Sequence, residues 1–435
     1  MAFQPRLIFP FPTRTPSWFA GHMARSLREL PTLLEDIDLV IEARDARLPL
    51  TSINSAFDDV LSKVRMDRKG KGREKLVVYT KRDLAEGKYE EPLRKAFFEH
   101  SGQKVLFADT RVDRDARDIL RLAVRIAKTH ADTMPEMKIL VVGMPNVGKS
   151  SLLNALRRVG VHKGKAFKTG ALAGVTRKLT GTVKIYEEPS IYVYDTPGVM
   201  MPYLGKGEKG AERGLKLALT SGIKESLFEQ DSVVDFLLYL MNLRLADQAH
   251  LHQSDPLRHP TYLETLPLPA RFTYPTNNIH SLLDALADRL GALRKGGERD
   301  IDSAITFLLR SFREGKLGRW TLDDLESKQQ QDFTGTSEIL DQLRSQGLPT
   351  GSGMKEDAPE TVSLDARVSA AVRTYLQTTA QAQIDTAEGT NLSPAQQRKV
   401  DIKAKVEERI TKWKSKGIDV APSFARGKAQ GKGRG

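Results

Sequence analysis

A glycine-rich segment with the sequence GMPNVGKS, residues 143–150, carries the clearest chemical signal in the chain. It fits the pattern GxxxxGK[ST], with a predicted strand before it and a predicted helix that begins at Lys149. Backbone N–H groups of such a loop point toward phosphate oxygens, the lysine reaches the β and γ phosphates, and the hydroxyl of Ser150 ligates Mg²⁺. The segment therefore predicts a nucleotide-phosphate site, and the alternative is a chance match in a glycine-rich turn.

Two short segments downstream could complete such a site. Asp195 begins the sequence DTPG after a predicted strand at 190–194, where its carboxylate can hold a metal ion through water and the amide of Gly198 can meet a γ phosphate. Thr176 ends the sequence GVT, where a mobile loop can close its hydroxyl and carbonyl onto Mg²⁺. DTPG alone is an ordinary turn more often than a site, whereas the three segments in this order are much more specific.

A fourth segment has the chemistry to recognise guanine. The sequence TKRD, residues 80–83, fits the pattern [NT]KxD, in which the aspartate accepts hydrogen bonds from the guanine N1–H and exocyclic amine and so rejects adenine. It follows a predicted strand, and the sequence FADT, residues 107–110, follows the next strand as a loop that backs the base. No [NT]KxD occurs after Gly198, so the parts of a GTP site are present in a cyclically changed order. The alternative for TKRD is a surface charge pair.

The elements that must position these loops alternate in type along the first half of the chain. Strands are expected at 38–43, 76–79, 105–108, 137–142 and 190–194, and helices at 23–34, 92–100, 116–131 and from Lys149 onward. Alternating strands and helices predict an α/β fold whose parallel sheet is covered on both faces. A second, α-helical domain should follow, with helices at 211–227, 232–245, 280–293 and 301–314.

We divide the chain into four parts. In order, these are an N-terminal arm at 1–17, an α/β domain at 18–205, a smaller α-helical domain at 206–325, and a mostly flexible polar extension at 326–435 with a basic tail. The arm contains four prolines, and the first 28 residues hold four arginines and no acidic residue, a charge bias typical of a targeting segment. In the tail, Trp413 and Phe424 lie among basic residues, which suits stacking on nucleic acid, and the alternative is a solvated end.

The composition excludes several kinds of chemistry. With no cysteine among 435 residues, the chain can have no disulfide, thiolate zinc site, iron–sulfur cluster or cysteine nucleophile. The best candidate for a membrane-spanning helix, at 233–241, is too short to cross a bilayer. A net charge of +13 favours polyanionic partners such as RNA or an anionic membrane face, and the alternative is a basic protein that is merely soluble.

Taken together, the motifs resemble those of a known family. The order TKRD, GMPNVGKS, GVT and DTPG, with WFAGHM at 18–23 and EARDARLP at 42–49, is similar to that of the circularly permuted P-loop GTPases of the YlqF/RbgA family, which act in ribosome biogenesis. The resemblance covers residues 18–324, and within the family it is strongest to the mitochondrial ribosome-associated members. It implies a circularly permuted GTPase domain, followed by the α-helical domain and the polar basic extension.

The resemblance also implies partners and a location. It implies a GTP hydrolase that acts on the maturing large subunit of the mitochondrial ribosome and its RNA, on the matrix side and peripheral to the inner membrane. Its intrinsic rate would be low and would rise on ribosomal particles. Because the chain leaves DTPG directly into the helical domain, GTP state could control RNA affinity. The alternatives are a nucleotide-gated RNA-binding scaffold with vestigial hydrolysis and an adenine-specific ATPase, since Thr80 replaces the usual asparagine.

Site residues follow from the motifs and the resemblance. The residues expected to bind GTP are Thr80, Lys81, Arg82, Asp83, Ala108, Asp109, Thr110, Asn146, Val147, Gly148, Lys149, Ser150, Ser151 and Gly198. The expected Mg²⁺ ligands are Ser150, Thr176 and Asp195, and Asn146 matches relatives that coordinate K⁺ at this position. The expected catalytic residues are Lys149, Thr176 and His22.

Activation of the attacking water needs a group other than the usual one. Val199 stands where ordinary small GTPases have the glutamine that orients water, and a valine cannot polarise it. A K⁺ ion held by Asn146 could supply the charge that an arginine finger supplies elsewhere. His22 is a second candidate, in the leading motif, and the alternative for it is a residue that anchors the N-terminal helix.

Overall fold

A computed structural model gives the fold of the chain. It describes residues 3–12, 21–63, 74–129, 136–167, 182–196, 198, 204, 207–224, 227–249, 259–326 and 363–387, and the single positions 401, 402, 404, 406 and 408. Residues 1–375 form one compact unit and residues 376–435 a second. The candidate site lies entirely in the first unit.

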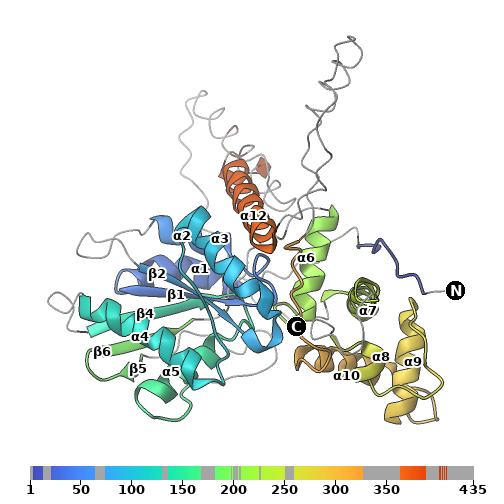
Figure 1. Ribbon diagram of the computed structural model, residues 1–435. Helices are drawn as coiled ribbons and strands as arrows, with labels where there is room; N and C mark the ends of the chain where they lie inside the picture. The colour runs from blue at the N-terminus through green and yellow to red at the C-terminus, as the bar shows by residue number, and fades with distance from the viewer. Residues whose placement is uncertain are drawn as a thin grey trace, which may run out of the picture. The chain divides into compact units, whose positions relative to one another are not determined.

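A six-stranded sheet forms the centre of the first unit (Figure 1). Its strands are β1 (Leu39–Asp45), β2 (Glu74–Thr80), β3 (Val105–Phe107), β4 (Glu136–Gly143), β5 (Val183–Tyr186) and β6 (Ser190–Asp195), in the order β3-β2-β1-β4-β6-β5. All neighbours are parallel except β5 and β6, which are antiparallel. The prediction of a parallel sheet is confirmed for the five strands that were predicted, whereas β5 was not predicted and pairs antiparallel with β6, to which a short turn joins it.

Helices cover both faces of the sheet. They are α1 (Gly21–Leu34), α2 (Ser55–Lys63), α3 (Glu90–Ser101), α4 (Asp113–Thr129) and α5 (Lys149–Gly160). Helices α4 and α5 pack against each other, whereas right-handed crossovers place α2 and α3 on the opposite face. The predicted strands and helices are confirmed here with shifted ends, while α2 and β5 were not predicted. Because helices shield both faces, every residue of β1 is buried, including its charged ones.

The helical part follows the sheet in the chain. Its helices are α6 (Gly207–Leu219), α7 (Gln230–Asp247), α8 (Tyr262–Thr265), α9 (Ile279–Leu290) and α10 (Ile301–Arg313). The first expected helix, 211–227, ends at Leu219 because Ser221 takes a left-handed conformation with φ 60°. Gly291, with φ 64°, ends α9 in the same way. One continuous hydrophobic core joins the sheet and these helices, so the domain boundary at 205/206 stays a prediction.

The N-terminal arm lies against α7, and its described residues form no helix or strand (Figure 1). Phe9 is buried, with its ring 5.1 Å from that of Phe236. The guanidinium of Arg6 pairs with Asp235 at 2.7 Å, and the hydroxyl of Tyr239 donates to the Leu7 carbonyl at 3.2 Å. Residues 3–12 therefore belong to the folded core of the first unit, which the sequence did not indicate.

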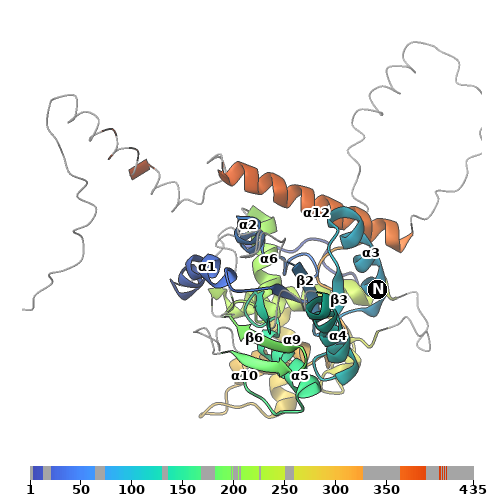
Figure 2. The same cartoon turned by 90° about the vertical axis from the view of Figure 1, so that its left-hand side faces the viewer.

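The expected flexible extension contains a long helix, α12 (Leu364–Ala387), which Figure 2 shows as one continuous element. Within the first unit its Val368 and Val372 are buried, one turn apart on one face, and Arg367 pairs with Glu326 at 3.0 Å. The prediction of a mostly flexible segment is therefore wrong over this helix, and the basic tail lies outside the described residues. None of the described helices is long and apolar enough to cross a membrane.

Candidate functional site

The predicted site loops meet at one edge of the sheet. Strands β1, β2, β4 and β6 are parallel and end at Asp45, Thr80, Gly143 and Asp195. In open parallel sheets, ligands bind outside these carboxyl ends. The arrangement thus brings the phosphate-loop segment, DTPG and TKRD together, although they are far apart in the sequence.

The phosphate loop has the backbone that its glycines permit. Gly143 has φ 148°, and a Cβ there would overlap the carbonyl oxygen of Ala43 on β1. Gly148 has φ 93° and precedes α5, and Asn146 also takes a positive φ of 56°. The amide of Asn146 donates to the Ser221 carbonyl at 2.9 Å, which ties the loop to the segment after α6. The conformation of the loop is therefore fixed by its close approach to β1 and by its hydrogen bond to the segment after α6.

Lys149 is the buried cation of the phosphate loop. Its Nζ donates to the carbonyls of Met144 at 2.9 Å and Gly143 at 3.3 Å. Burial lowers the pKa of its ammonium to about 8, against the attraction of Asp195, and Lys81 lowers it further. A buried ammonium is stabilised most by hydrogen bonds to an anion. A phosphate group is therefore the ligand that this position favours.

A hydroxyl and a carboxylate come together beside the phosphate loop. Ser150 Oγ donates to Asp195 Oδ2 at 2.6 Å, and Asp195 is 1% exposed. Oxygen donors of this kind, with one carboxylate, suit Mg²⁺, which keeps several of its waters and adds substrate phosphate oxygens. The predicted ligands Ser150 and Asp195 thus fit the ion, whereas Thr176 lies outside the described residues.

DTPG approaches the phosphate loop closely. A Cβ on Gly198 would lie 2.5 Å from the Cα of Pro145, so only glycine fits there without movement. The hydroxyl of Thr196 donates to the Val141 carbonyl at 2.7 Å, which fixes the segment to β4. Val199 and the side chain of His22 are not described, so both of their roles remain predictions.

TKRD joins the phosphate loop through Thr80. Its hydroxyl donates to the Arg44 carbonyl at 3.0 Å and also contacts the carbonyl oxygen of Val147. Lys81 follows with φ 56°, and the N–H of Arg82 donates to the Ala108 carbonyl at 3.3 Å. The predicted base loops, 80–83 and 107–110, therefore lie side by side, next to the phosphate loop.

Asp83 and Asp109 share one arginine. Arg111 contacts Asp83 at 2.5 Å and Asp109 at 2.9 Å. Burial raises the pKa of Asp83, and the nearby carboxylate of Asp109 raises it further. Asp83, Asp109 and Arg319 are among the residues that line a cavity of about 360 Å³. A planar base fits such a cavity, and Arg111 would have to release Asp83 for the base to reach it.

Two more predicted residues lie nearby in defined positions. The carbonyl of Thr110 accepts from Arg158 on α5 at 3.1 Å, and Ser151 lies in the first turn of α5. No role was predicted for Asp45, Arg47 or Arg111, although Asp45 contacts Lys81, Arg47 contacts Asp45, and Arg111 contacts Asp83. The sequence signal that could have identified them is a buried strand that ends in charged residues, as β1 does.

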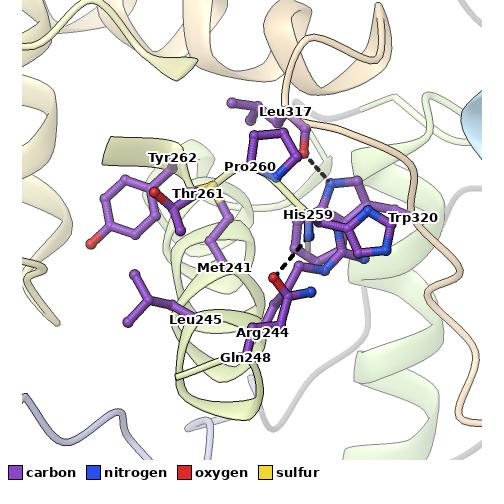
Figure 3. Close-up of a pocket in the computed structure, with 10 residues that line it drawn as sticks. All are labelled: Met241, Arg244, Leu245, Gln248, His259, Pro260, Thr261, Tyr262, Leu317 and Trp320. Atoms are coloured by element: carbon purple, nitrogen blue, oxygen red, sulfur yellow. Dashed lines mark hydrogen bonds between the residues drawn. The ribbon is translucent and has the colours of Figure 1, made fainter. Parts of the chain in front are cut away.

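The loop after TKRD is held from the helical part. The N–H of Trp320 donates to the Leu84 carbonyl at 2.8 Å, and the guanidinium of Arg244 lies 3.2 Å from the centre of the Trp320 ring. Glu86 lies 3.5 Å from both Arg244 and His259. Figure 3 shows Arg244, His259 and Trp320 grouped at the end of α7. These contacts fix the end of the base loop to residues far along the chain.

Comparisons with known proteins show which chains this one resembles. Residues 138–260 match the family model described as 50S ribosome-binding GTPase. Mitochondrial ribosome-associated GTPase 1 of Xenopus tropicalis is 32% identical over 321 residues, 70% of this chain and 94% of that protein. Mitochondrial GTPase 1 of Schizosaccharomyces pombe is 31% identical over 350 residues, 76% and 95% of the two chains. The crystal structure of GNP-bound YlqF from T. maritima aligns with a TM-score of 0.42 and 19% identity, over 69% and 97% of the chains.

The family match also bears on the order of the motifs. It begins at residue 138, on the strand before the phosphate loop, whereas TKRD ends at residue 83. The base motif therefore precedes the phosphate loop, as in a circularly permuted GTPase fold. With 94% of the Xenopus tropicalis protein covered at 32% identity, the chain belongs to the family of mitochondrial ribosome-associated GTPase 1, whose members are GTP-hydrolysing enzymes.

Proposed function

We propose that this protein is a GTP-hydrolysing assembly factor for the large subunit of the mitochondrial ribosome. Its GTP state would control its binding to ribosomal RNA and to the particle. The names of its relatives support a mitochondrial, ribosome-associated role, and the net charge of +13 suits an RNA partner. The finer location, on the matrix side and peripheral to the inner membrane, belongs to the same proposal.

The contact of Thr80 with the phosphate loop carries the proposal. Its hydroxyl links the strand end of β1 to Val147, so the base loop and the phosphate loop are in direct contact. A single nucleotide can then meet both loops at once. If the two loops bound separate ligands, they would not need this contact.

The residues would divide the work as follows. Backbone N–H groups at 146–150 hold the phosphates, and Lys149 moves from the loop carbonyls to the β and γ oxygens. Ser150, Asp195 and Thr176 would hold Mg²⁺, which neutralises developing phosphate charge when bound. Asp83 accepts from the N1–H and amine of guanine, which selects GTP over ATP.

Hydrolysis would be slow without a partner. Val199 cannot orient water, so the water must be activated by a group that the ribosomal particle orders, with His22 as one candidate. The oxygen of the Asn146 carboxamide suits K⁺, and K⁺ beside the β and γ phosphates would add positive charge in the transition state. We therefore expect turnover to rise both with particles and with K⁺.

GTP turnover by the purified protein tests this function. The reaction is run in K⁺ and in Na⁺ buffer, with and without mitochondrial large-subunit particles, and Lys149→Ala is the blank. We expect turnover above the blank that rises with particles, and a K⁺ effect that Asn146→Ala removes. Binding of GTP with no turnover above the blank in any condition would contradict the enzymatic part.

The second candidate is a nucleotide-gated RNA-binding scaffold with vestigial hydrolysis, which Val199 in place of the water-orienting glutamine favours. It is separated from the first by comparing Lys149→Ala with a variant blocked only in hydrolysis. If the hydrolysis-blocked variant still supports subunit assembly while Lys149→Ala does not, the scaffold function holds.

A further inference from the structure

Two strand ends lie side by side next to the base loop. Asp45 is the last residue of β1 and Thr80 the last residue of β2, and they are register partners in the parallel pair. The N–H of Ala46 donates to the Thr80 carbonyl at 3.0 Å. The segment 45–47 therefore lies directly against the first residues of TKRD.

Asp45 holds two cations. Its Oδ2 accepts from Lys81 Nζ at 2.8 Å and from Arg47 Nη2 at 2.8 Å, and its Oδ1 accepts from Arg47 Nε at 3.1 Å. The residue is 2% exposed, and Arg47 and Lys81 together hold the pKa of the carboxyl well below its usual range against burial. A buried carboxylate with such partners stays ionised at neutral pH.

Lys81 depends on this carboxylate for its direction. Its backbone has φ 56°, a left-handed conformation that side chains other than glycine rarely adopt. Its side chain is partly exposed, at 24%, and points its ammonium back to Asp45. The long stem would otherwise sample many rotamers, and the ion pair selects one of them.

Arg47 fixes Asp45 in turn. Its guanidinium lies 5.9 Å from the centre of the Phe312 ring, and its carbonyl accepts from the N–H of Leu322 at 2.8 Å. Arg47 also lowers the pKa of Asp83, which opposes the effect of burial there. Asp45 thus acts on Lys81, and Arg47 acts on Asp83, two of the three charged residues of TKRD.

We propose that Asp45 is a positioning residue for base recognition: it aims Lys81 so that the stem of this lysine lies along the purine face of a guanine nucleotide. The inference rests on the proposed function, because it takes Lys81 to be one of the residues that bind GTP. In the described part of the chain, the side-chain hydrogen bonds of this pair join Asp45, Lys81 and Arg47, and its effect on the phosphate loop is through charge, since Lys81 lowers the pKa of Lys149. Loss of the pair should therefore weaken the part of binding that comes from the base and leave the part that comes from the phosphates.

Two ligands separate these parts. GDP carries base and phosphates, whereas inorganic tripolyphosphate carries phosphates alone. We expect Asp45→Asn in the full chain to weaken GDP binding about tenfold, equivalent to one such contact, with tripolyphosphate binding changed less than twofold. Asp58→Asn is the matched control, because Asp58 pairs with Lys75 at 2.5 Å, away from the base loop, and should change neither.

A double-mutant cycle tests whether Asp45 acts through Lys81. Lys81→Met should cost a similar factor for GDP, and the double variant should cost little more than either single one. Additive losses, or equal losses for GDP and tripolyphosphate, would overturn the inference. Thermal melts show whether each variant folds. If Asp45→Asn does not fold, Lys81→Met still tests the inference, because its loss of affinity for GDP should exceed its loss of affinity for tripolyphosphate. Wild-type protein that binds no GDP would refute the proposed function itself.

Discussion

The two halves of the candidate site are built in different ways. On the phosphate side, Gly143 and Gly148 set the loop through backbone conformation, and the Ser150–Asp195 hydrogen bond is its main contact between side chains. On the base side, buried or half-buried charges hold one another across long sequence separations, as Lys81 does with Asp45. Local backbone thus shapes the phosphate side, and non-local electrostatics shape the base side.

This difference predicts separable functions. Changes on the phosphate side should affect every nucleotide equally, whereas changes on the base side should affect the choice among nucleotides. If the two sides are independent, a change on one side alters only one of these two properties. If they are coupled, the change alters both.

The largest effect is expected for Lys149→Ala. The change removes the buried ammonium that would bind the β and γ phosphates, so affinity for GTP, ATP and tripolyphosphate should fall by about 100-fold or more, from two lost charge-assisted hydrogen bonds. Calorimetry measures the three affinities. Lys184→Ala serves as the control, because this half-buried lysine pairs with Glu187. A loss of affinity confined to GTP would contradict the separation of the phosphate side from the base side.

A base-selective effect is expected for Asp83→Asn. The substitution removes the carboxylate that accepts two hydrogen bonds from guanine, so GDP affinity should fall by about 50-fold while tripolyphosphate affinity stays within twofold. Competition among GDP, XDP and ADP measures the preference, which should move toward XDP because asparagine can donate to the xanthine 2-oxygen. Asp118→Asn, on the exposed side of α4, should leave it unchanged.

A smaller effect is expected from pH. Because the pKa of Lys149 in the free protein is about 8, its ammonium loses its proton as the pH rises through this value. Bound phosphate favours the charged form, so binding takes up a proton there and GDP affinity should fall about fourfold between pH 7 and 8.5. Lys149→Arg, which does not titrate in this range, should give a flat profile. A rising affinity would contradict the assignment.

The smallest effect on nucleotide binding is expected for Phe9→Ala, which touches neither side. Its ring is buried against α7, so the free energy of unfolding should drop by about 3 kcal/mol. Leu7→Ala is the matched control, because Leu7 is 84% exposed two residues away and should cost little. Denaturant melts measure both, and GDP affinity should remain at the wild-type value.

The same contrast explains what could be predicted from the sequence. The phosphate loop and its flanking strand and helix are contiguous, so glycine spacing and hydrophobic periodicity were enough. The Asp45–Lys81 and Arg47–Leu322 contacts join distant segments, and no local pattern encodes them. The pairing of TKRD with the phosphate loop was expected only because the whole set of motifs was present.

Missed elements have related causes. Strand β5 is short and lies at a sheet edge, so its few residues gave no clear alternation. The burial of Phe9 depends on Phe236, far along the chain, and the prolines of the arm indicated only an extended segment. Helix α12 mixes apolar and polar residues without a clear apolar face, and its buried Val368 and Val372 were too few to stand out.

The contacts between the two ends of the first unit make the connection at residue 205 dispensable for cohesion. The arm at 3–12 crosses from the sheet part onto α7, and in the opposite direction the segment 320–323 crosses from α10 onto Leu84, Arg47 and the residues after them. Each of the two parts, sheet and helical, thus contributes a segment that packs on the other. We therefore expect a chain nicked between DTPG and α6 to remain a single particle.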